Sequence, residues 1–64
     1  SVQFLLSQIT PAHADYAFVA LDRVQSQQGV EMIKAAASGS KDAAGIDARY
    51  LPALRRIAES RGNS

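Results

Sequence analysis

The segment between Ala14 and Ala37 decides the fold, and it reads ADYAFVALDRVQSQQGVEMIKAAA. Apolar residues recur in it at intervals of three and four, which is the spacing of one face of an α-helix. They are Ala14, Ala17, Phe18, Leu21 and Val24 in the first half, then Val30, Met32, Ile33, Ala36 and Ala37. Gly29 costs a helix about 0.5–1 kcal/mol relative to alanine, which packing can offset. We therefore expect one long helix over residues 11–38, straight or bent at Gly29, rather than two helices.

The residues on either side of this segment supply the helix boundaries. Thr10 can cap the long helix with its hydroxyl, and Pro11 suits the first helical position because its missing N–H would have no partner there. Gly39 fits the left-handed residue that closes a helix. Upstream, the helical spacing of a shorter apolar face predicts a two-turn helix over residues 2–9. The residues of that face are Val2, Leu5, Leu6 and Ile9.

Downstream of Gly39, the spacing predicts a further helix over residues 48–61, in which Tyr50, Leu54 and Ile57 stack on one face. Asp47 is its expected cap, with Pro52 in the first turns. Ser40 or Asp42 could cap a segment in between, and residues 43–46 fit either a turn of helix or a loop. Strand signals are weak throughout, because β-branched residues are scattered and no hairpin turn is present.

These elements predict an all-α fold in a single domain, residues 1–64. The architecture is a helical hairpin, the long helix 11–38 against the helix 48–61, with the short helix 2–9 packed across it. Leu21 and Leu54 are expected to face each other in the core.

The composition predicts a thin core. A chain of 64 residues buries about 60% of its unfolded surface, and twelve of its residues are alanine, which packs closely but adds little buried area. There is no cysteine to form a disulfide or a zinc site. Helix packing and association with a second chain are the remaining sources of stability, so a homo-oligomer or a complex with a partner protein is expected.

The charged and nucleophilic residues show no catalytic, metal or cofactor pattern. His13 is the one imidazole, and Asp15 two residues away falls on another helix face, so a solvated histidine is the simpler interpretation. The carboxylates have no metal-loop spacing, and Gly39-Ser40-Lys41 lacks the frame of a phosphate loop. We predict no cofactor, no metal and no enzymatic activity. No apolar run reaches the ~18–20 residues that a membrane-spanning helix needs.

The function predicted is a protein-interaction or assembly module. The long helix carries a second apolar stripe, turned away from Leu21, that one hairpin partner would leave uncovered. The last half of the chain is basic and the first half acidic, which favours pairing between them or between two copies, and an arginine pair could dock an acidic partner. The predicted interaction residues are Val19, Val30, Ile33, Ala37, Arg55 and Arg56.

The alternative is a helix-turn-helix DNA-binding protein that uses residues 30–50. Ala35 and Gly39 have the spacing of the turn in that motif. Asp42 and Asp47 argue against it, since both would approach the DNA phosphates, and the net charge of +1 provides no overall attraction to nucleic acid.

Overall fold

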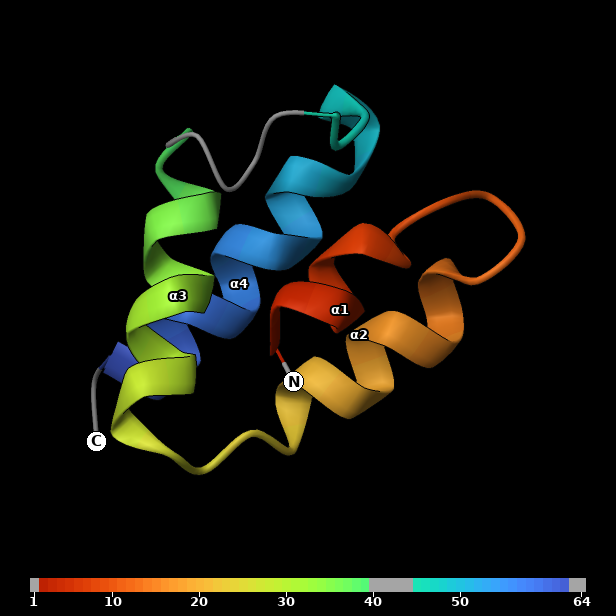
Figure 1. Cartoon of the computed structure of the whole chain (residues 1–64). Helices are drawn as coiled ribbons and strands as arrows, with labels where there is room; N and C mark the ends of the chain where they lie inside the picture. The colour runs from red at the N-terminus through yellow and green to blue at the C-terminus, as the bar shows by residue number, and fades with distance from the viewer. Residues whose placement is uncertain (1, 40–44, 63–64) are drawn as a thin grey trace.

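The computed structural model describes residues 2–39 and 45–62 (Figure 1). Those residues form four α-helices and one short 3-10 helix, and they contain no strand. The all-α fold class is therefore confirmed. The elements are α1 (Val2–Ser7), α2 (Ala14–Asp22), α3 (Gln27–Ala37), η2 (Ala48–Tyr50) and α4 (Leu51–Gly62).

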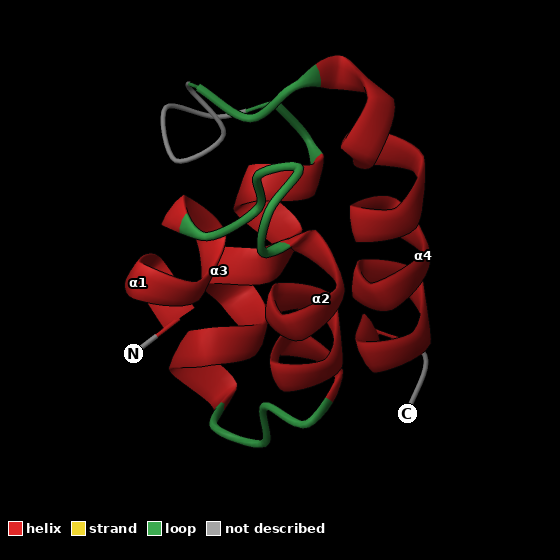
Figure 2. Ribbon diagram, turned by 90° about the vertical axis from the view of Figure 1, so that its right-hand side faces the viewer, coloured by secondary structure: helices red, strands yellow, loops and turns green. Residues whose placement is uncertain are grey.

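The helices are arranged around a pair, α3 and α4, which lie side by side and run in opposite directions (Figure 1). This pair makes the most extensive contact between described elements. The helix α1 packs against α2 and α3, while α4 also contacts α2. In Figure 2, α1 lies on one side and α4 on the other, with α2 and α3 between them. A helical hairpin is thus present, but its first arm is α3 alone and not a helix over residues 11–38, and the N-terminal helices pack against it.

The prediction of one long helix over residues 11–38 is wrong, because the chain leaves helical geometry between α2 and α3. Ser26 has extended backbone angles (φ −68°, ψ 142°), and its Oγ accepts a hydrogen bond of 3.0 Å from the Gly29 N–H. It is thus an N-cap, a position that serine strongly favours. The break falls before Gly29, which is itself inside α3.

The break keeps the molecule compact. A straight helix of 28 residues would be about 42 Å long, whereas the longest extent of the molecule is 30 Å. The remaining residues could not cover such a rod. Dividing it into α2 and α3 lets Leu21 and Ile33 enter the same core.

The start of α2 also differs from the prediction. Residues 11–13 form turns, and the helix begins at Ala14 after His13, whose side chain makes no capping hydrogen bond. Thr10 contributes its carbonyl oxygen, which accepts from the N–H groups of His13 (3.1 Å) and Ala14 (2.7 Å). The carbonyl oxygen of Thr10, and not its hydroxyl as predicted, therefore accepts the hydrogen bonds at the start of α2.

Two other boundary predictions are confirmed. Gly39 ends the α3 turn at φ +88°, in the left-handed region that glycine enters without strain. Asp47 caps η2, and its Oδ1 accepts a 2.9 Å hydrogen bond from the Arg49 N–H. The predictions for Ser40, Asp42 and residues 43–44 lie outside the described residues.

The core is small and formed by all four helices. Leu21, Ile33 and Leu54 are its largest completely buried side chains, so the prediction that Leu21 and Leu54 are core residues is confirmed. Alanines fill most of the remaining space, as expected for helices in close approach. The other buried members of the cluster are Leu6, Ile9, Ala17, Ala36, Ala37 and Ala58.

Candidate functional site

The outward-facing side of α2 exposes the large apolar side chains Tyr16 and Val19. Tyr16 is 60% exposed and Val19 is 54% exposed. They are three residues apart on a helix, so they lie next to each other on its surface. The charged residues on the same side are also exposed. We call this surface the α2 outer face, and it consists of Asp15, Tyr16, Val19, Asp22 and Arg23.

Among the predicted interaction residues, Val19 is the one that the structure leaves largely open to solvent on this face. Val30 is half-buried. Ile33 is completely buried and Ala37 is 6% exposed, so both are core residues of the single chain and not surface residues. The prediction of a second apolar stripe depends on one continuous helix over residues 11–38. Because the chain breaks between α2 and α3, Val19 and Ile33 no longer share one face.

Sequence reasoning missed Tyr16, Asp15 and Arg23. A helical wheel restricted to residues 14–22 would have placed Tyr16 with Val19 on the exposed side, because the buried residues of α2 are Ala14, Ala17 and Leu21. Tyr16 and Val19 are opposite those positions at 100° per residue. The exposed pair could therefore be predicted from residues 14–22 alone, but it is lost when the spacing is assigned to one helix over residues 11–38.

The two predicted docking arginines have different surroundings. The Arg55 Nε donates to the carbonyl oxygen of Ala37, the last residue of α3, at 3.4 Å. Arg61 does the same for α2, because its Nη2 donates to the carbonyl oxygen of Asp22. Each arginine therefore satisfies a carbonyl that a helix end leaves without an intrahelical partner, and its positive charge suits the negative end of the helix dipole. Arg56 is exposed.

Replacing Arg55 with methionine should reduce the free energy of unfolding by about 0.5–1 kcal/mol, because the bond to Ala37 is long and partly solvated. The matched control is Arg56→Met, which removes the same charge from the next residue and should change stability by less than about 0.5 kcal/mol. Urea denaturation of both variants measures the difference. Equal losses would show that the bond to α3 contributes nothing beyond charge.

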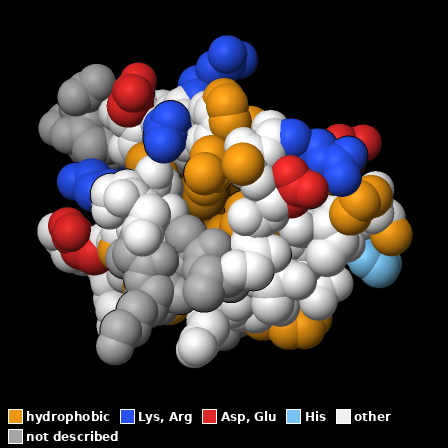
Figure 3. Space-filling view, turned by 90° about the horizontal axis from the view of Figure 1, so that it is seen from above, with side chains coloured by type: hydrophobic (Ala, Val, Ile, Leu, Met, Phe, Trp, Pro, Cys, Tyr) orange, Lys and Arg blue, Asp and Glu red, His pale blue; other side chains and the backbone are white. Residues whose placement is uncertain are grey.

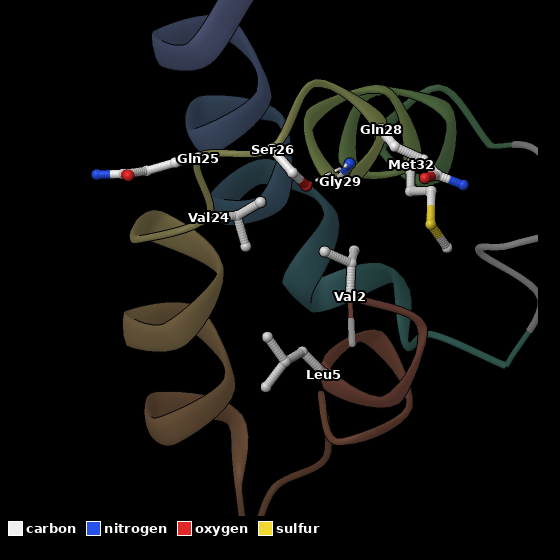
Figure 4. A pocket seen from close by; sticks show the side chains of 8 residues that line it. All are labelled: Val2, Leu5, Val24, Gln25, Ser26, Gln28, Gly29 and Met32. Atoms are coloured by element: carbon white, nitrogen blue, oxygen red, sulfur yellow. Dashed lines mark hydrogen bonds between the residues drawn. The ribbon is translucent and has the colours of Figure 1, made fainter.

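A second surface feature is an open groove of about 530 Å³ between α1, the connection from α2 to α3 and the start of α3. In Figure 4, Val2 and Leu5 point from α1 toward Val24 and the turn at Ser26, while Met32 lies on α3. All of the lining residues are uncharged, and those not yet named are Gln25, Gln28 and Gly29. The groove has no charged or titratable group that could orient a polar ligand.

A third feature is a small cluster of ring and charged side chains around η2. The Arg49 guanidinium lies 3.2 Å from Asp47 Oδ2 and 5.3 Å from the centre of the Tyr50 ring. Tyr50 in turn packs at a tilt against Phe18, with the ring centres 6.2 Å apart. The backbone N–H of Arg49, and then its guanidinium, lower the pKa of the Asp47 carboxyl. The ring contact between Tyr50 and Phe18 holds η2 against α2, and the charges of Asp47 and Arg49 pair with each other.

In the described ranges, no group of three or more His, Cys, Asp or Glu side chains is placed to hold a metal ion. His13 is exposed at the start of α2. None of the described helices has the length and apolarity to cross a bilayer.

The helix-turn-helix predicted over residues 30–50 would place its turn and second helix partly on residues 40–44, which lie outside the described residues, so this alternative stays a prediction. That motif joins its two helices by a turn of three or four residues, at about 90–120°. Among the described elements, α3 and α4 lie alongside each other in opposite directions, which is not the crossing that this motif uses. Positive and negative side chains are also intermingled on the face that Figure 3 shows, without a broad area of one sign.

Comparison of the chain with protein-family models, with curated proteins and with solved structures gives no match. The class that the fold defines is a small all-α protein with a thin, alanine-rich core. Of the three exposed large apolar side chains among its described residues, Phe4, Tyr16 and Val19, the last two lie next to each other on the α2 outer face.

Proposed function

We propose that the chain is a protein-interaction module that binds through the α2 outer face. The observation that supports this is the exposure of Tyr16 and Val19 next to each other on one helix. Single exposed apolar residues are common and need no explanation, but tyrosine is enriched at protein interfaces, where its ring supplies area at low entropic cost. A small chain with few large apolar residues leaves two of them outside its own core here.

The charges around the pair fit the same proposal. Asp15, Asp22 and Arg23 are exposed around Tyr16 and Val19, which is the arrangement of an apolar centre within a polar rim. The groove at α1 offers no comparable polar groups.

The test is photo-crosslinking from position 16. Tyr16 is replaced with p-benzoylphenylalanine, which keeps an aromatic ring there, and the chain is irradiated in lysate of the cells that produce it. The control carries the same group at Ala53, which is exposed on α4. Adducts, with a second copy or another protein, should form from position 16 and not from position 53. Absence of adducts, or equal adducts from both positions, would refute the proposal.

A further inference from the structure

The α2 outer face has a symmetry in its sequence that bears on the identity of its partner. Asp15 and Arg23 lie four residues before and four residues after Val19. Tyr16 and Asp22 lie three residues before and three after it. Each pair couples groups that attract: a carboxylate with a guanidinium, and a phenol donor with a carboxylate acceptor.

Within one chain these groups are too far apart along α2 to meet. Asp15 and Arg23 are separated by eight residues, which is about 12 Å of helix. Across the described ranges, neither takes part in an ion pair. Their charges suit the two ends of the helix dipole, which explains their signs but not their equal distance from an exposed valine.

Two copies of α2 packed antiparallel, with a two-fold axis at Val19, would bring the complementary groups together. Asp15 of one copy would face Arg23 of the other, and Tyr16 would face Asp22, each contact occurring twice. This is the self-complementary pattern that a two-fold interface requires. The two helix dipoles would also run in opposite directions, which is the favourable arrangement.

We propose that the partner of the α2 outer face is a second copy of this chain, bound as an antiparallel two-fold dimer centred on Val19. This inference rests on the proposed function and names the partner. The dimer is weak, because α2 has nine residues and such a surface is smaller than the ~800 Å² per partner of a standard stable interface. We expect dissociation constants between about 10 µM and about 1 mM.

The test uses charge reversal and mixing, read by sedimentation equilibrium over that range of concentration. Asp15→Arg places two arginines opposite each other at each contact, and Arg23→Asp does the same with two carboxylates. Each variant alone should dimerise about tenfold more weakly than the wild type, since two attractive pairs become two repulsive ones. An equimolar mixture of the two variants should restore association, because every contact in the mixed dimer again joins opposite charges.

The mixture separates the interface from effects on α2 itself. Both reversals place a charge that the helix dipole disfavours, so each variant is first checked by circular dichroism for its helix content. Loss of helix cannot be repaired by mixing, whereas loss of complementarity can. The reversal Arg56→Asp on α4 is the control and should leave the dissociation constant unchanged.

Three outcomes would overturn the dimer. These are a wild type that remains at its monomer mass of 6.8 kDa throughout the range, reversals without effect on association, and a mixture that associates no better than its components. A crosslink from position 16 to a different protein, together with a monomeric wild type, would refute the dimer and leave the proposed function standing.

Discussion

Replacing Leu54 with alanine should leave most of the chain unfolded at 25 °C. Leu54 is completely buried, and it is one of three large side chains in that condition, with Leu21 and Ile33. Truncating a buried leucine costs about 2–5 kcal/mol, because the lost transfer energy is joined by the cost of a cavity. A chain of this length rarely has more than about 3–5 kcal/mol in total. The loss therefore equals or approaches the whole stability.

The measurement is the helical circular dichroism signal and its urea dependence, at a concentration low enough to keep the chain monomeric. Leu21→Ala should give the same result, as its side chain is equally buried. Val19→Ala is the control, since it shortens an exposed apolar side chain and should change stability by less than about 0.5 kcal/mol. A Leu54→Ala variant that unfolds at the wild-type urea concentration would show that the core does not depend on this residue.

Ile33 belongs with this prediction. The sequence predicts Ile33 as an interaction residue, at which a glutamate would act on the interface. Its complete burial places the change inside the single chain instead, where an unpaired carboxylate is costly. Ile33→Glu should therefore unfold the monomer and cannot serve as a test of self-association.

Local patterns predicted the parts of the fold that depend on local contacts. Leu21 and Leu54 follow from the apolar spacing of their own helices, because the buried side of a short helix repeats every three or four residues. Asp47 and Gly39 follow from the chemistry of helix ends, which involves residues within one turn. In each case the deciding contacts span few positions of the chain.

The break between α2 and α3 could not be predicted in the same way. Gln25, Gln27 and Gln28 are good helix formers, and Ser26 is tolerated in a helix as well as at its start. What decides between these is the packing of Leu21 and Ile33 into one core, which local sequence does not contain. The hydrogen bonds from Arg55 and Arg61 to the ends of α3 and α2 depend on the same tertiary arrangement. A basic helix surface alone could not distinguish them from solvated charges.

Gly29 was interpreted as the weak point of a long helix, and its surroundings assign it another role. It is buried in the first turn of α3, beside α1. A Cβ atom at this position would lie 2.6 Å from Val24 Cγ1, 2.8 Å from Ser26 Oγ and 2.9 Å from Val2 Cγ2. Each distance is shorter than the contact that two such atoms tolerate. The hydrogen atom of glycine is what allows α1 and the turn at Ser26 to approach α3.

Gly29→Ala should consequently lower the free energy of unfolding by about 1–2 kcal/mol. Two effects oppose each other. Alanine favours the helix by about 0.5–1 kcal/mol, whereas forcing an extra methyl group into a packed site costs about 1–3 kcal/mol. The packing cost should prevail, because valine side chains have few alternative rotamers and the Ser26 Oγ is held by its bond to the Gly29 N–H.

Urea denaturation gives the sign, and a double-mutant cycle with Val2→Ala gives the cause. Removing the Val2 methyl groups takes away one of the three close contacts, so Gly29→Ala should cost less in the Val2→Ala background than in the wild type. Gln28→Ala, at an exposed position of the same helical turn, reports helix propensity without the packing cost and should be neutral or slightly stabilising. If Gly29→Ala stabilises the chain as well, α1 shifts to admit the methyl group at no cost and the close approach is not what requires glycine there.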